Sequence, residues 1–82
     1  MLSIKPIGAN QTELTANGMQ VLFSYETPVA AILADGSCMK TSKKWSNTTT
    51  RHINKWFNNM VIPREMGQEF FDNLVSQFDL KG

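Results

Sequence analysis

Eighty-two residues with 41% hydrophobic side chains are enough for one domain around one core, and this composition excludes a disordered chain. No apolar run is long enough to cross a bilayer, the first ten residues lack the basic-then-apolar order of a secretory signal, and a single cysteine excludes an internal disulfide. We therefore expect residues 1–82 to form one compact domain in a reducing cytoplasm, without a membrane partner.

The net charge of +1 hides a strong segregation of charge along the chain. Residues 1–36 hold one lysine against three acids, residues 37–64 hold six basic residues and no acid, and residues 65–82 hold one lysine against four acids. The three segments therefore carry −2, +6 and −3. Such asymmetry bears on partners rather than on fold, and it makes the middle segment the candidate contact surface.

The N-terminal part of the chain predicts a β-hairpin. The first ten residues contain Pro6 and Gly8 without periodicity, so we expect an irregular entry with a short edge strand near residues 2–4. Asn17-Gly18 then lies between two alternating runs, and this pair is preferred in type I′ turns because both central residues need positive φ. The expected register pairs Ala16 with Met19, Leu14 with Val21 and Thr12 with Phe23.

A third and a fourth strand are expected over residues 29–33 and 37–42. Thr27-Pro28 interrupts the second strand, because proline cannot donate a ladder hydrogen bond. Asp35-Gly36 is a second hairpin signal between the third and fourth strands. The pattern leaves open which residues share the buried face: Ala30, Ile32 and Met39, or Ala31, Leu33 and Cys38.

The segment from residue 51 to residue 60 predicts an amphipathic helix, because its apolar residues follow the i, i+3, i+4, i+7 spacing. Ser46 or Asn47 is the expected N-cap, since its side-chain oxygen can accept a hydrogen bond from a first-turn N–H. The opposite face of this helix is basic and rich in amides. The apolar stripe consists of Ile53, Trp56, Phe57 and Met60.

A second, acidic helix is expected from Pro63 to the end of the chain. Pro63 suits the first helical position because its missing N–H needs no partner there, and Glu65 favours the same start through the helix dipole. Lys81 and Gly82 are expected to end the helix. The elements together predict an α+β domain, in which an antiparallel meander of three or four strands precedes two α-helices packed on one face.

No group of residues in the sequence completes a catalytic or metal site. His52 is the only histidine, no acid lies between Gly36 and Arg64 to orient it, and we expect it to be partly buried with one hydrogen bond. One histidine and one cysteine fall short of the three or four ligands of a zinc site, and Cys38 is expected to be a small strand residue. We therefore expect a non-enzymatic protein without a metal or cofactor.

The basic segment contains the residue types that neutralise phosphates, stack on bases and read base edges, which favours nucleic-acid binding. The competing explanation is a solvated helix face with the tryptophans in the core. Trp56 is expected in the core, whereas Trp45 fits either a core lid or an exposed platform. The alternative function is a module that binds or inhibits a host or viral protein, or pairs with itself, through the same surface. The candidate contact residues are Lys40, Lys43, Lys44, Trp45, Arg51, Lys55 and Asn58.

The strings Tyr-Glu-Thr-Pro-Val-Ala at residues 25–30, Lys-Trp-Ser at 44–46 and Thr-Arg-His-Ile-Asn-Lys-Trp at 50–56 resemble a small domain of unknown function that recurs in tailed-bacteriophage genomes. The resemblance covers residues 18–57 and does not include the acidic helix. It implies a viral origin and action in the cytoplasm of an infected bacterium. It supplies neither an activity nor a catalytic residue.

Overall fold

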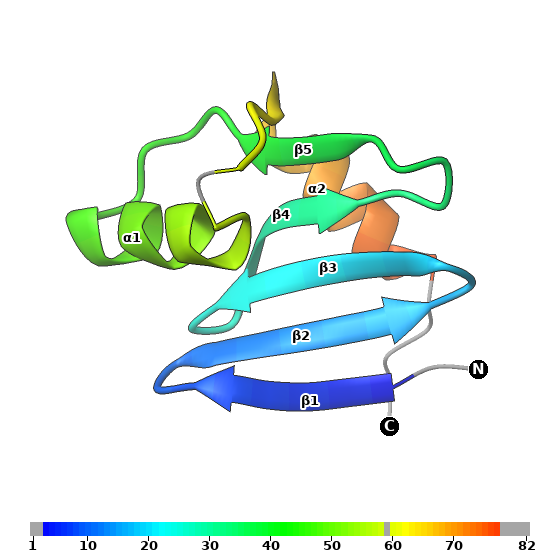
Figure 1. Cartoon of the computed structure of the whole chain (residues 1–82), viewed down its shortest axis with the longest axis horizontal. Coiled ribbons are helices and arrows are strands. Elements are labelled where there is room, and N and C mark those ends of the chain that lie inside the picture. Colours follow the sequence, from blue (N-terminus) through cyan, green and yellow to red (C-terminus); the bar gives the residue numbers. More distant parts are fainter. Residues whose placement is uncertain (1–2, 59, 78–82) are drawn as a thin grey trace.

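Six strands and two helices make up the described part of the chain, residues 3–58 and 60–77, in the computed structural model (Figure 1). The strands form one sheet in chain order, antiparallel from β1 to β5, with β6 parallel to β5. This confirms the predicted α+β fold of a strand meander and two helices. The elements are β1 (Ser3–Gly8), β2 (Gln11–Ala16), β3 (Met19–Ser24), β4 (Thr27–Ile32), β5 (Cys38–Thr41), α1 (Asn47–Trp56), β6 (Arg64–Met66) and α2 (Gln68–Ser76).

The predicted hairpin between β2 and β3 is confirmed in both turn and register. Asn17 and Gly18 have φ values of 51° and 79°, as a type I′ turn requires. All three predicted cross-strand pairs occur, from Ala16 with Met19 outward. Local turn chemistry therefore decides the alignment of these two strands.

Strand β1 is longer than the predicted short edge strand. It pairs with β2 along its length and turns at Asn10, which has a φ of 60°. Pro6 lies within this strand, opposite Thr12. An edge strand tolerates proline because one side of it needs no ladder partner.

Strand β4 begins at Thr27, so the predicted interruption at Pro28 is wrong. Pro28 pairs with Phe23, and the register shifts at this point, which leaves Val29 as an additional residue between two paired positions. A bulge of this kind re-aims side chains. It lets Val29 and its neighbour Ala30 enter the same core cluster.

The hairpin between β4 and β5 closes through a three-residue loop. Gly36, with a φ of 91°, donates its N–H to the Leu33 carbonyl at 2.9 Å, and the Leu33 N–H bonds the Ser37 carbonyl at 2.8 Å. Hydrogen bonding by Ser37 lowers the pKa of the Asp35 carboxyl. Neither predicted set of buried residues is right, because Met39 pairs with Ala31 and Cys38 with Ile32.

The two helices cover opposite faces of the sheet, so the prediction that both pack on one face is wrong. Figure 1 shows α1 in front of the sheet and α2 behind it. Ile53 of α1 belongs to a core cluster with Leu22, whereas Phe71 of α2 belongs to a second cluster with Val21. Neighbouring strand residues point to opposite faces, and here both are fully buried. Helix α1 makes the crossover that the parallel pair β5 and β6 needs. After β6 the chain forms α2, which packs on the other face of the sheet.

Helix α1 begins as predicted but ends earlier. The Ser46 hydroxyl caps it by accepting a hydrogen bond from the Thr49 N–H at 3.1 Å. The helix ends at Trp56, and Asn58 has a φ of 56°, the left-handed conformation that follows many helix ends. Met60 is therefore 80% exposed and lies outside the helix.

Helix α2 begins at Gln68 and not at Pro63. The segment after Pro63 is extended and pairs with β5, so the proline precedes a strand. Proline fixes φ at a value that suits either element, which is why this signal was ambiguous. The predicted end at residues 81–82 lies outside the described residues. Neither described helix has the length and apolar character needed to cross a membrane.

Candidate binding surface

A hollow of about 240 Å³ opens between β5, the connection over residues 42–46, and α1. Lys40 reaches it from β5, and Lys43 and Lys44 reach it from the connection. Thr50 and Asn54, one turn apart on α1, line the helix side. Four of the candidate residues, these three lysines and Trp45, thus surround one concave site, which we call the basic hollow.

Trp45 is held at the rim of the basic hollow. Its indole Nε1–H donates to Gln68 Oε1 at 3.1 Å, and the ring is 42% exposed. The ammonium of Lys43 lies 4.1 Å from the ring centroid, which is a cation–π contact. Trp45 is therefore neither a core lid nor a bare platform, because one tether fixes its edge and a lysine accompanies its ring.

Arg51 and Lys55 lie outside the basic hollow. They are one turn apart on α1 and exposed, on the side of the helix away from buried Ile53. Asn58 does not continue this row, because it follows the helix in the left-handed conformation. The candidate residues therefore divide into the basic hollow, an outward row of Arg51 and Lys55, and a helix-ending asparagine.

The fold brings one acidic residue of the C-terminal segment, Glu65, next to the basic segment. Parallel pairing of β5 and β6 sets Glu65 directly beside Lys40, and Glu65 lines the basic hollow. A carboxylate in this position lowers the net positive charge around the basic hollow. No local sequence signal predicts this neighbour, because the pairing joins residues 25 positions apart. The i, i+4 spacing of Thr50 and Asn54 was the one available signal for the helix side.

A chain of hydrogen bonds on the other flank of α1 links the helix to β3. His52 Nδ1 lies 2.8 Å from Ser24 Oγ, which lies 3.0 Å from Thr49 Oγ1. The ring of Tyr25 lies beside His52, with centroids 6.1 Å apart. Ser24 is only 2% exposed, so its hydroxyl is inaccessible to a substrate and the chain serves to fasten α1. His52 is partly buried with one such bond, as expected.

Trp56 also belongs to this flank of α1. It is half buried against the Leu22 cluster, and its Nε1–H donates to Glu13 Oε1 at 2.9 Å. Trp56 therefore has a structural role, and the indole at the candidate surface is that of Trp45.

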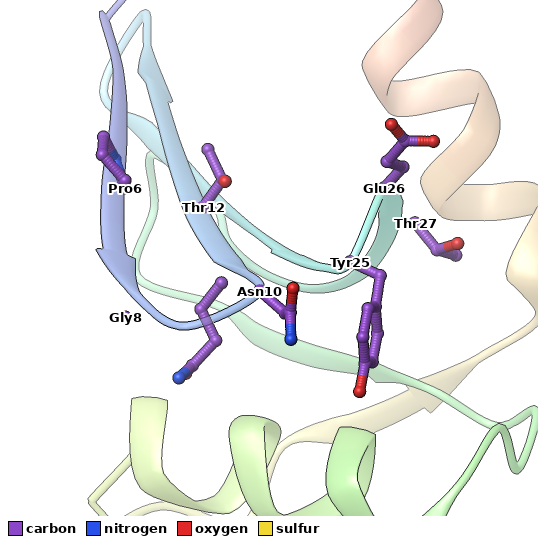
Figure 2. A pocket seen from close by; sticks show the side chains of 8 residues that line it. Pro6, Gly8, Asn10, Thr12, Tyr25, Glu26 and Thr27 are labelled. Atoms are coloured by element: carbon purple, nitrogen blue, oxygen red, sulfur yellow. The ribbon is translucent and has the colours of Figure 1, made fainter.

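A larger hollow of about 640 Å³ lies where the β1–β2 turn meets the β3–β4 turn (Figure 2). Asn10 lines it from the β1–β2 turn and Thr12 from the start of β2, and Tyr25 and Glu26 line it from the β3–β4 turn. Figure 2 shows the side chains of Tyr25 and Glu26 leaving their turn in different directions, with Tyr25 pointing toward α1. The Tyr25 N–H donates to the Asn10 carbonyl at 2.7 Å, which holds the two turns together. This hollow contains no basic side chain, so it lacks the means to neutralise phosphate.

Possible metal ligands and the single cysteine were compared with what a metal site or a reactive thiol requires, within residues 3–58 and 60–77. These residues contain no group of three histidine, cysteine or acidic side chains placed to hold a metal ion. Cys38 is a free cysteine, half buried in β5, and its Sγ lies 3.5 Å from the Gly36 carbonyl. That arrangement agrees with the expected small strand residue.

The sequence of this chain matches one known protein family. A model described as a family of unknown function (DUF8033) matches residues 2–73, which include both faces of the sheet and the basic hollow. The chain belongs to this family. No curated protein and no solved structure matches the chain. Membership of DUF8033 supplies no activity.

Proposed function

We propose that this member of DUF8033 is a non-enzymatic bacteriophage accessory protein that binds nucleic acid in the host cytoplasm. The basic hollow is the contact site, and the outward row of Arg51 and Lys55 extends it. The observation that carries the proposal is the convergence of Lys40, Lys43 and Lys44 on one concave site that also contains an indole and an amide. Ammonium groups neutralise phosphates, and indole and amide groups contact bases.

The geometry supports contacts to both the backbone and the bases of a nucleic acid. Lys44 and the outward row are exposed, and their long side chains can reach phosphates. Asn54 lies between these groups and can offer both a donor and an acceptor to a base edge. A base that stacks on Trp45 would meet Lys43 at the ring, so we expect this lysine to move from the ring to a phosphate.

The test is fluorescence anisotropy of labelled single-stranded and double-stranded DNA at about 50 and about 200 mM salt. Phosphate binding is expected to weaken by orders of magnitude over this range, because each contact releases a counterion. The variant Lys44→Glu should bind more weakly, with the salt slope reduced by about 1.

Lys5→Glu is the matched control, because it makes the same change of charge on exposed β1, at the other end of the sheet. It should change affinity far less than Lys44→Glu. Equal weakening by both variants would mean that net charge alone attracts the DNA. No binding by the unmodified protein at the lower salt would refute the proposal.

A protein-binding role is the second candidate, and a separate observation favours it. Met60, Val61 and Ile62 are consecutive and exposed, an arrangement that is uncommon on a surface without a partner. Binding through this segment should respond weakly to salt, because apolar contacts are not screened. Capture that survives at about 200 mM salt and is lost in Ile62→Asp would support this candidate.

A further inference from the structure

The turn between β3 and β4 contains the least ordinary backbone conformation of the described chain. Four residues other than glycine have positive φ within residues 3–58 and 60–77. Three of them are asparagines, which tolerate this conformation, and the fourth is Tyr25, with a φ of 59°. A side chain as large as that of tyrosine is unfavourable there, and glycine is a usual residue where a two-residue loop needs positive φ.

The fold does not require a tyrosine at this position. The Tyr25 side chain is 52% exposed, and its ring meets that of His52 at a tilt of 45° without stacking on it. The bond that holds the two turns together, from the Tyr25 N–H to the Asn10 carbonyl, uses a backbone group that glycine would supply equally well. An unfavourable conformation at an exposed residue therefore indicates a contact with something outside the chain.

Tyr25 borders the hollow of about 640 Å³ between the β1–β2 and β3–β4 turns, which we call the turn hollow. Figure 2 shows the side chains of Asn10 and Tyr25 extending in the same direction from the two turns. Gln11, Thr12 and Thr27, which are half buried, also line the turn hollow. Its volume falls within the range of about 300–1,000 Å³ that is typical of small-molecule sites.

The polar side chains of the turn hollow are free to bind a ligand. Among the side-chain hydrogen bonds of residues 3–58 and 60–77, none uses the amides of Asn10 and Gln11 or the hydroxyls of Thr12 and Thr27. A side-chain amide offers both donors and an acceptor, and a hydroxyl offers a donor and two acceptor lone pairs. The site can therefore satisfy a ligand that donates and accepts hydrogen bonds at many points.

The chain also leaves space for one of these amides. A Cβ at Gly8 would lie 2.7 Å from Gln11 Nε2, so the lack of a side chain at residue 8 lets the amide lie against the backbone of β1. Gly8 does not have positive φ, so its conformation alone does not call for glycine. Space for the Gln11 amide is the local reason for a glycine at this position.

We propose that the turn hollow binds a neutral carbohydrate, with the ring of Tyr25 as the platform on which a sugar ring packs. A sugar ring presents C–H groups on its face, and these suit the electron-rich face of an aromatic ring. The hydroxyls at the edge of the sugar both donate and accept, as the amides of Asn10 and Gln11 do.

The charges of the turn hollow favour a neutral ligand. None of the described residues that line it is basic, so a phosphate or carboxylate group would find no opposite charge. Its one carboxylate, that of Glu26, leaves the turn in a different direction from the Tyr25 ring, so the two do not enclose a cation (Figure 2). A nucleobase can stack on Tyr25, but the phosphates attached to it would lack partners here.

The experiment is a titration of the isotope-labelled protein with maltose, cellobiose and N,N′-diacetylchitobiose, followed by heteronuclear NMR. We expect at least one of these disaccharides to shift the backbone signals of Asn10, Gln11 and Tyr25 in a saturable manner. A site with one stacking ring should have a dissociation constant of about 1–10 mM. Glycerol, which has hydroxyls but no ring, is the control ligand and should not saturate the site.

Tyr25→Gly separates binding from folding. Loss of the ring should weaken disaccharide binding by about tenfold or more, whereas relief of the positive φ should keep the midpoint of urea unfolding at or above that of the unmodified protein. Tyr25→Phe keeps the ring and should bind within about twofold of the unmodified protein. Asn58→Gly is the matched control, because it relieves a positive φ outside the turn hollow and should leave sugar binding unchanged.

Gly8→Ala tests the contribution of the amide. The new Cβ would displace the end of the flexible Gln11 side chain, so the fold should persist while the affinity for the disaccharide falls by about threefold or more. Far-ultraviolet circular dichroism checks that each variant retains its fold.

Three results would overturn the proposal. They are the absence of saturable shifts at the turn hollow with all three disaccharides, shifts that glycerol reproduces, and sugar binding that Tyr25→Gly leaves intact. Lys44→Glu, at the basic hollow, should bind sugar like the unmodified protein. This inference and the proposed binding of nucleic acid can therefore fail separately.

Discussion

Gln68 connects more of the molecule than any other single side chain at the candidate surface. Its Oε1 accepts hydrogen bonds from Thr41 Oγ1 at 2.8 Å and Trp45 Nε1 at 3.1 Å, and its Nε2 donates to the Pro28 carbonyl at 2.7 Å. One residue at the start of α2 therefore ties β4, β5 and the connection over residues 42–46 together. The rim of the basic hollow is positioned from the opposite face of the sheet.

We predict that Gln68→Leu lowers the free energy of unfolding by about 1–3 kcal/mol, because the hydroxyl of buried Thr41 loses its acceptor and the Pro28 carbonyl loses the Gln68 donor. Urea unfolding monitored by tryptophan fluorescence measures this change. Gln77→Leu is the matched control at an exposed position and should change stability by less than about 0.5 kcal/mol. Similar values for both variants would show that the hydrogen bonds of Gln68 contribute little.

Sequence could predict individual residues only where the chemistry is local. Asn17-Gly18 carries its own conformational requirement, so both turn and register followed from two residues. The roles of Gln68 and Glu65 depend on contacts with residues 23 to 40 positions away, and no spacing rule connects them. Sequence therefore located the lysines of the candidate site but not Glu65 and Gln68, which the fold brings close to it.

Among the elements, α1 shows how a helix can end inside its own apolar pattern. The stripe predicted continuation to Met60, yet Asn58 adopts a φ of 56° and its N–H bonds the Lys55 carbonyl at 3.0 Å. Asparagine tolerates this conformation better than most residues. The periodicity includes Met60 by coincidence, because Met60 lies beyond the end of the helix and is exposed.

A substitution at Asn58 distinguishes a helix that ends before this residue from one that continues to Met60, because the two cases predict opposite changes in stability. Asn58→Gly should raise the free energy of unfolding by up to about 1 kcal/mol, because glycine adopts positive φ without steric cost. If the helix continued through this residue, glycine would instead lower stability. Asn54→Gly, inside α1, is the control and should lower the free energy of unfolding by about 0.3 kcal/mol. Urea unfolding of the three proteins measures both signs.

The element boundaries that sequence missed share a physical cause. Pro63 fits the first turn of a helix and the entry to an edge strand equally well, and Pro28 fits the start of a strand beside a bulge. In each case proline restricts its own φ but does not select the element. Pairing with β5 or β3, which is set by the whole fold, makes the choice.

At the scale of the whole molecule, the sheet separates two cores. Ile53 and Leu22 belong to the core beneath α1, and Phe71 belongs to the core beneath α2. Sequence could not assign the helices to faces, because the apolar stripe of a helix says that it packs but not on which side. The second face of the hairpin formed by β2 and β3 is also covered, and Ser24 on that face is buried under α1.

Two separate cores should respond independently to mutation. Ile53→Val and Phe71→Leu should each lower stability by about 0.5–1.5 kcal/mol, and the double variant should equal their sum within about 0.5 kcal/mol. Leu22→Val combined with Ile53→Val is the comparison pair within one core and should depart from additivity. Coupling between Ile53 and Phe71 as large as that within the pair would contradict two independent cores.

The burial of both faces changes what holds the strands in alignment. In a sheet with one wet face, a slip by one residue exposes the apolar set, so hydrophobicity itself enforces the pairing. Here Val21 and Leu22 are both buried, and so are Ala30 and Ala31, so a slipped strand would still place apolar residues inside. The information that selects the native alignment therefore resides in the turns and in the bulge at Val29. Damage to a turn in this protein should produce a mixture of misaligned sheets rather than a simple loss of stability.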